Sequence, residues 1–163
     1  MQNHNWSTFT TKLYIQAKPE KVYQAWATQE GMEKWFLKTC AYGNRKKNEA
    51  VQSGDTYIWT WHTKDNYTDK GKIIETQKPN YFKFTFGPVA TCAVSIAEEN
   101  GATLVKLVQE KIPTDEKSKV MWNVNCQTGW TYFLLNLKAY LEHGIDLRDK
   151  DTRRLEDCSE YME

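Results

Sequence analysis

The 163-residue sequence lacks the long apolar runs and the charge excess that mark several classes of protein. No apolar run is long enough to span a bilayer, so we expect no membrane insertion. The formal net charge is +1, which supplies no basic field for nucleic acid, and we expect no nucleic-acid partner. Residues 1–12 contain no apolar segment typical of a signal peptide. We therefore expect a cytoplasmic protein.

Closely spaced cysteines are also missing. Cys40, Cys92, Cys126 and Cys158 stand far apart, without a C-x-x-C pair and without a histidine at metal-ligand spacing. We therefore expect no metal site, and free thiols that fit a reducing cytoplasm. Cys92 and Cys126 lie inside apolar patterns, so we expect both to be buried as small hydrophobic residues.

Signatures of catalysis and of cofactor binding are equally sparse. The spacing suggests no Ser–His–Asp set, no glycine-rich phosphate loop and no calcium-binding loop. The candidates for acid–base chemistry are His62, Asp55, Glu75 and Glu110. His62, Glu75 and Glu110 lie near predicted strand ends, where such side chains usually meet solvent. We therefore predict no catalytic residue and no cofactor, and an enzyme is the minority interpretation.

Aromatic residues, by contrast, are plentiful. They make up 13% of the chain, with seven tryptophans and nine tyrosines. Such a surplus suits a lined pocket or an interface, and it equally suits a bulky core. Composition alone leaves the two interpretations open.

The segment 119–144 predicts a long amphipathic helix. Its apolar residues recur at three- and four-residue steps and so share one stripe. Thr114 or Asp115 is suited to begin the helix, and Gly144 is suited to end it with a left-handed cap. We place the helix over roughly residues 116–143. The stripe consists of Trp122, Cys126, Trp130, Phe133, Leu134, Leu137 and Leu141.

The preceding part of the chain predicts antiparallel strands. Period-two alternation indicates a strand over 9–16, and five more over 55–62, 68–76, 81–86, 91–97 and 102–109. Asn100-Gly101 is a hairpin signal, and Gly71 is a possible bulge. Between the first two strands, Pro19 introduces two short helices, 19–27 and 32–36.

The predicted fold is therefore α+β, a curved antiparallel sheet of six to seven strands around a long C-terminal helix. We expect a single domain over residues 1–163, with a core of about 8–144 and a charged, solvated tail over 145–163. The basic run of Arg45, Lys46 and Lys47 lies in a polar loop and is expected to be solvated, with anion binding as the lesser alternative.

A curved sheet with one helix across it encloses space that is either filled or hollow. We predict an apolar, ligand-binding cavity there, lined from both sides. Ile58 would replace the two tryptophans on the inner face if a bulge inverted that strand. The predicted lining is Trp59, Trp61, Phe82, Phe84 and Phe86 on the sheet, and Trp122, Cys126, Trp130 and Phe133 on the helix.

Several short segments follow one another in an informative order: Pro19–Trp26, Lys34–Phe36, Gly54-Asp55, Gly71–Glu75, Gly129-Trp130, Leu134 and Leu137–Leu141. In this order they resemble the helix-grip superfamily of START-related and pollen-allergen-like proteins, SRPBCC. Within it, the chain is most similar to the branch named after activators of the ninety-kilodalton heat-shock-protein ATPase. The resemblance implies a deep apolar cavity between sheet and helix. The superfamily includes lipid carriers, cyclases, hydrolases and co-chaperone domains, so it implies no single function.

Three functional hypotheses follow. The leading one is a cytoplasmic binding protein for a small apolar or aromatic ligand. The second is an enzyme of the polyketide-cyclase type, which would use the shape of the cavity and one or two polar groups. The third is a co-chaperone-like module that docks a chaperone or another protein on the sheet edge or the long helix.

Overall fold

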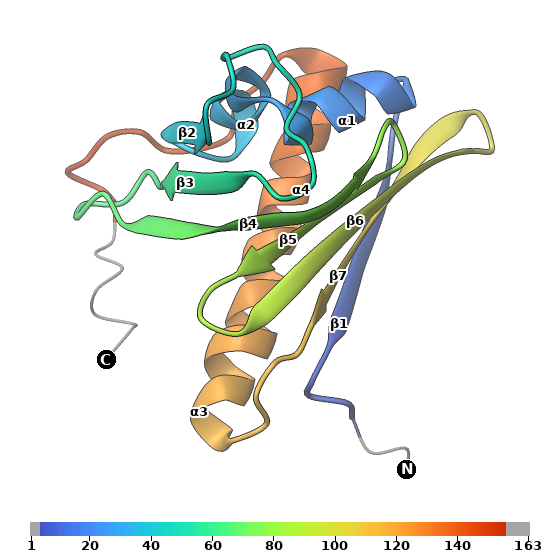
Figure 1. The fold of residues 1–163 in the computed structure, drawn as a ribbon. Helices are drawn as coiled ribbons and strands as arrows, with labels where there is room; N and C mark the ends of the chain where they lie inside the picture. The colour runs from blue at the N-terminus through green and yellow to red at the C-terminus, as the bar shows by residue number, and fades with distance from the viewer. Residues whose placement is uncertain (1–3, 156–163) are drawn as a thin grey trace.

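The structure, a computed structural model, describes residues 4–155. Seven strands form one antiparallel sheet in the order β1-β7-β6-β5-β4-β3-β2 (Figure 1). The predicted fold class is confirmed, with β2 as a seventh strand that alternation did not locate. The strands are β1 (Phe9–Ile15), β2 (Thr39–Tyr42), β3 (Thr56–Thr60), β4 (Thr68–Gln77), β5 (Tyr81–Phe86), β6 (Ala90–Glu99) and β7 (Ala102–Glu110).

Two short helices follow β1, as predicted. Helix α1 (Pro19–Ala27) begins with proline, whose fixed φ suits the first helical turn. Helix α2 (Gln29–Trp35) begins after Thr28, whose hydroxyl accepts a hydrogen bond from the Gly31 amide at 3.0 Å. The Trp35 indole donates to the Ala25 carbonyl at 3.0 Å and so ties the two helices together.

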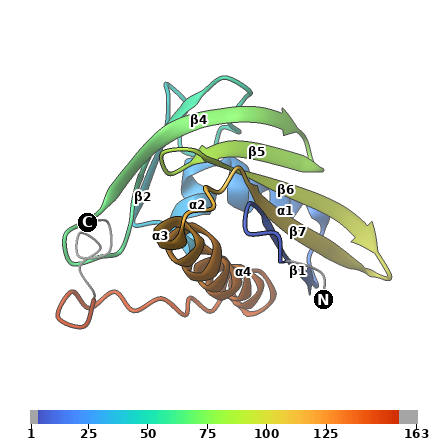
Figure 2. The ribbon, with the colours of Figure 1, turned by 90° about the horizontal axis from the view of Figure 1, so that it is seen from below.

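One long helical segment crosses the concave face of the sheet (Figures 1 and 2). It consists of α3 (Glu116–Ser118), η1 (Lys119–Asn125) and α4 (Cys126–His143), and it confirms the predicted range of 116–143. Asp115 caps the start through the Ser118 amide at 3.0 Å, and Gly144 ends the helix with φ of 68°. The difference is that η1 is a π-helix, a widened turn for which the apolar stripe gives no signal.

Strand β4 differs from its prediction in one detail. The register shift lies between Ile73 and Glu75, so Gly71 is not the bulge. Gly71 pairs with Tyr57, and a side chain there would collide with the Tyr57 ring. The glycine is therefore explained by the close approach of a neighbouring side chain.

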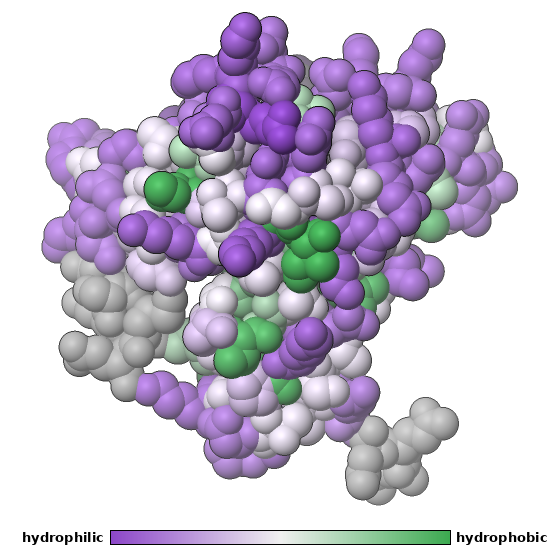
Figure 3. Space-filling model, viewed as in Figure 1, coloured by the Kyte–Doolittle hydropathy of each residue, from purple (hydrophilic) through white to green (hydrophobic). Residues whose placement is uncertain are grey.

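The phase of β3 follows the favoured alternative. Tyr57 and Trp59 are buried against the helix side, and Ile58 is 46% exposed on the convex face. Figure 3 shows the apolar residues of that convex face as separate patches between polar ones. Aromatic residues of β3 therefore belong to the concave side, where the long helix lies.

Side chains fill one half of the space between sheet and helix. Trp26 of α1 enters this space, fully buried, with its ring centroid 5.9 Å from that of Trp130 and 6.2 Å from those of Phe82 and Phe84. Trp59 closes the group at 5.1 Å from Phe84. Aromatic rings bury a large apolar area, and this burial dominates the contribution of such a cluster to the stability of the fold.

Candidate ligand cavity

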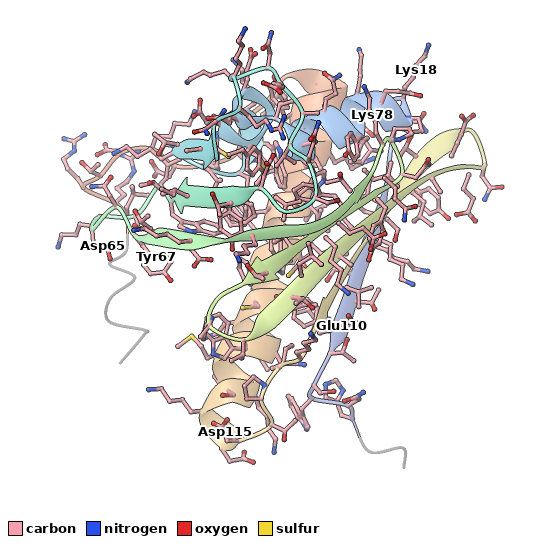
Figure 4. The ribbon with its side chains drawn as sticks, in the orientation of Figure 1. Lys18, Asp65, Tyr67, Lys78, Glu110 and Asp115 are labelled. Atoms are coloured by element: carbon pink, nitrogen blue, oxygen red, sulfur yellow. The ribbon has the colours of Figure 1, made fainter. Side chains whose placement is uncertain are left out.

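The other half of the space, which we call the hollow half, contains a cavity of about 950 Å³ that is partly open to solvent. Its walls come from the ends of β3, β4 and β5, from the π-helical and first α-helical turns, and from residues 148–155. Figure 4 shows Tyr67, one of the lining residues, on the turn between β3 and β4. Aromatic rings dominate the walls: Phe36, Trp61, Tyr67, Phe86, Trp122, Trp130, Tyr132 and Phe133.

Phe36 and Trp130 separate the hollow half from the packed half. Their rings are stacked with centroids 5.1 Å apart, and both side chains are almost completely buried. On the hollow side, Phe36 meets Trp61 at 4.5 Å and Phe133 at 4.8 Å, edge to face. These interlocked rings hold each other in place, so the cavity wall is formed without a ligand.

The nine predicted ligand-binding residues are therefore divided between the two halves. Trp59, Phe82 and Phe84 lie in the packed half, where Trp26 contacts the two phenylalanines, and none of the three lines the cavity. The sequence indicates that α1 is amphipathic, but not that its tryptophan enters the space under the sheet. The six that do line the cavity are Trp61, Phe86, Trp122, Cys126, Trp130 and Phe133.

Two buried amides hold the π-helical turn in position. Gln109 of β7 donates from Nε2 to the Trp122 carbonyl at 3.0 Å, and its Oε1 accepts from the Trp130 indole at 3.0 Å. Asn123 donates from Nδ2 to the Trp6 carbonyl at 3.0 Å. Because these buried amides are hydrogen-bonded, they fix the geometry of the π-helical turn. In this geometry the Trp122 ring lies against Gly87.

Most of residues 145–155 are exposed, as the predicted solvated tail requires, but four of them line the cavity: Arg148, Asp149, Arg154 and Leu155. Arg148 is 8% exposed, and its guanidinium donates to the Leu37 and Glu33 carbonyls at 2.9 and 3.0 Å. The same guanidinium binds both carboxylate oxygens of Asp146, at 2.8 and 2.7 Å. The charge-rich composition predicted exposure to solvent, but the bidentate ion pair with Asp146 allows Arg148 to be buried. Residues 156–163, including Cys158, lie outside the described part of the chain.

Two ionisable side chains line the cavity near the β3–β4 turn. His62 was predicted to be exposed, but β3 ends at Thr60, and the ring is half-buried in the cavity wall. Burial, with help from the nearby Arg148 charge, lowers the pKa of His62. Asp69 of β4 is half-buried too, and burial raises the pKa of its carboxyl.

Asp69 was missed by the sequence analysis. It pairs with Trp59 across β3 and β4 and therefore faces the concave side. Alternation puts residues 69, 71 and 73 on one face of β4. An aspartate on the same face as the buried Ile73 therefore indicates an acidic group on the concave side. Only the strand register shows which aromatic side chains surround it.

The other acid–base candidates lie elsewhere. Asp55 is paired with Arg45 at 2.8 Å, and Glu110 lies 3.7 Å from Lys83. Asp55, Glu75 and Glu110 do not line the cavity. Figure 4 shows Glu110 far from Tyr67, towards the Asp115 end of the long helix.

Of the predicted buried thiols, Cys92 is fully buried, whereas Cys126 is only half-buried in the cavity wall. Burial raises the pKa of the Cys126 thiol to about 11, which keeps it protonated and a weak nucleophile. Among the described residues, no group of three or more His, Cys, Asp or Glu side chains is placed to hold a metal ion. No helix in that part of the chain has the length and apolar character to cross a membrane.

Comparison with known proteins identifies the relatives of this fold. The model of the family described as "Activator of Hsp90 ATPase homolog 1-like protein" matches residues 16–142, which is most of the chain. The comparison with curated proteins found no match.

Solved structures share the fold at low sequence identity. A Staphylococcus saprophyticus protein is 22% identical with a TM-score of 0.71, over 86% of this chain and 96% of that one. The Aha1 dimer from Colwellia psychrerythraea is 21% identical with a TM-score of 0.68, over 84% and 97%. A protein of the dynemicin biosynthetic locus is 14% identical with a TM-score of 0.69, over 88% of this chain and 50% of that one.

Proposed function

The chain belongs to the family of Activator of Hsp90 ATPase homolog 1-like proteins, and we propose that this member binds a small apolar or aromatic ligand in its cavity. The observation that carries the proposal is a cavity of about 950 Å³ whose walls are mainly aromatic rings. Pockets for small molecules typically have about 300–1,000 Å³ and apolar walls with a few polar groups.

The walls of this cavity are held by contacts among their own residues, which supports a preformed binding site and not a packing defect. Phe36, Trp61 and Phe133 contact each other edge to face, and the Trp122 backbone is fixed by Gln109. A wall that is already ordered loses little conformational entropy when a ligand enters. The same chain fills its other half with Trp26, so the fold is capable of closing such space.

The proposed setting is the cytoplasm, and the proposed partner is a small hydrophobic molecule. Cys40, Cys92 and Cys126 are free thiols, which fits a reducing compartment. The Arg45 loop takes no part in the site, because Arg45 is paired with Asp55 and Glu49 outside the cavity.

The test is binding of N-phenyl-1-naphthylamine, an uncharged fluorescent probe, to the wild type and to Gly129→Phe. Gly129 lines the cavity, and a Cβ added there meets no atom within 4 Å, so a phenylalanine ring would occupy the hollow. We expect micromolar binding to the wild type and at least tenfold weaker binding to Gly129→Phe. Gln127→Phe is the matched control, because Gln127 is exposed on the same helix outside the cavity. Arg45→Ala is also expected to bind normally.

Equal probe binding by Gly129→Phe and the wild type would place the probe elsewhere and contradict the proposal. If the folded wild type binds no probe at all, the protein-interaction module takes the place of the ligand carrier.

A cyclase-type enzyme is the second candidate, favoured by Asp69. This carboxyl lines an aromatic cavity with a raised pKa, which is a property of general acids and bases. Incubation with a poly-β-keto thioester, followed by mass spectrometry for a dehydrated cyclic product, tests this candidate. Turnover by the wild type that is lost in Asp69→Asn would support it, and absence of product would remove it.

A further inference from the structure

The cavity contains one carboxylate whose charge the described residues leave without an ionic partner. Asp69 lines the cavity, and no lysine, arginine or histidine in residues 4–155 forms an ion pair with it. Its Oδ1 accepts from the Lys70 amide at 2.8 Å, a bond within its own strand. A half-buried charge of this kind is costly unless a counter-charge approaches it.

The tyrosine beside Asp69 does not satisfy the carboxylate. The Tyr57 hydroxyl oxygen lies 3.3 Å from Asp69 Oδ2 but only 2.7 Å from the Thr85 carbonyl. A hydroxyl has one hydrogen to donate, and the shorter contact takes it. The hydrogen bonds that Asp69 receives therefore come mainly from backbone amides, which leave its charge without a counter-charge.

Arg148, Asp149 and Arg154, which also line the cavity, are already engaged in ion pairs. Arg148 is bound to Asp146, which also accepts from Lys150 at 2.8 Å. Arg154 is bound to both oxygens of Asp149 at 2.6 and 3.0 Å. An anionic ligand would meet arginines that are already paired, whereas a cationic ligand would meet Asp69.

Aromatic side chains line the same cavity as this carboxylate. The Gly87 amide contributes a hydrogen bond to Asp69, and the Trp122 ring lies directly against the Gly87 Cα. Phe86 precedes that glycine and also lines the cavity, as does Trp61. Ring faces carry negative potential and attract cations, most strongly when the site is partly dry.

From this arrangement we propose that the ligand is a hydrophobic amine or ammonium ion, with its cationic nitrogen at Asp69 and its apolar body among Trp61, Phe86 and Trp122. This inference rests on the proposed ligand-binding function and adds the class of ligand. It also accounts for an acidic residue on the same face of β4 as the buried Ile73.

The experiment uses three probes that share one ring system and differ in charge. These are 1-naphthylmethylamine, 1-naphthalenemethanol and 1-naphthoate, each titrated into the full-length protein at pH 7 by isothermal calorimetry. We expect the amine to bind about tenfold more tightly than the alcohol, and the naphthoate to bind least.

Asp69→Asn removes the charge and keeps the shape of the side chain. We expect the preference for the amine over the alcohol to fall to about one in this variant, while the affinity for the alcohol stays the same. Glu75→Gln makes the same charge change on the same strand outside the cavity, and it should keep the tenfold preference.

The outcomes separate this inference from the function on which it rests. If no probe binds, the proposed ligand binding itself fails. If the alcohol binds as tightly as the amine, or if the naphthoate binds best, ligand binding stands and the cationic ligand class is overturned. A preference for the amine that persists in Asp69→Asn would overturn the assignment to Asp69.

Discussion

The space under the sheet is solid in one half and hollow in the other, although aromatic residues supply both. In the solid half, Trp26 comes from a separate helix and fills the gap that sheet and long helix leave between them. In the hollow half no such side chain from residues 4–155 enters, and the walls are held by contacts among themselves and by Gln109. A helix-grip fold therefore encloses space by default, and an additional element decides how much of it stays open.

The largest expected difference between the halves is in stability. Trp26→Ala removes a fully buried ring from the centre of the solid half and should lower the free energy of unfolding by about 3–5 kcal/mol. Trp122→Ala removes a half-buried ring from the hollow half and should cost clearly less, because less apolar surface returns to water. Urea denaturation of both variants measures the comparison, and equal losses would mean that the halves are packed alike.

Arg148 tests whether the wall over the hollow half is fixed. Arg148→Met keeps the length of the side chain but removes the guanidinium that donates to Asp146 and to the Leu37 and Glu33 carbonyls. We expect a loss of about 3 kcal/mol, close to that for breaking other buried ion pairs. Limited proteolysis should also cleave the variant after residue 144 faster than the wild type. An unchanged cleavage rate would show that the wall does not depend on this arginine.

The sequence predicts the secondary structure of this molecule better than the side-chain contacts between its elements. Alternation and the apolar stripe locate six of the seven strands and the full length of the helical segment, because those signals are local in the chain. The roles of Trp26, Asp69 and Arg148 depend on strand register and on contacts between distant segments. The residue type of Arg148 is misleading, since a charged residue in a charge-rich end of a chain usually lies in solvent, whereas Arg148 is buried.

Acid pH should weaken the same wall by protonating Asp146, the partner of Arg148. Burial opposes ionisation of Asp146, but Arg148 and Lys150 outweigh it and hold the pKa of this carboxyl well below its usual range. A lowered folded-state pKa stabilises the fold above the unfolded-state pKa of about 3.9, and this stabilisation is lost as the pH falls through the folded-state value. Asp146→Asn should therefore cost about 2 kcal/mol at pH 7 and progressively less below about pH 4. Urea midpoints of the wild type and the variant between pH 7 and pH 2 measure this, and a constant difference would contradict it.

The smallest stability effect, and the one most specific to the hollow half, is expected for Gly87→Ala. Gly87 has φ of 58°, so any other residue is strained there, and a Cβ would lie 2.6 Å from the Trp122 ring. Gly101→Ala is the matched control, because its φ of 78° imposes the same kind of backbone strain while no atom lies within 4 Å of its Cβ. Each variant should lose about 1 kcal/mol from the backbone.

Only Gly87→Ala should also displace Trp122, a ring of the cavity wall, and so alter the affinity for N-phenyl-1-naphthylamine several-fold. Gly101→Ala should bind the probe like the wild type, because Gly101 lies on the distant β6–β7 turn. If both variants bind the probe alike, Trp122 does not form part of the binding wall. The binding wall would then consist of the other aromatic rings of the cavity, and the contrast with the solid half would have to be explained without the π-helical turn.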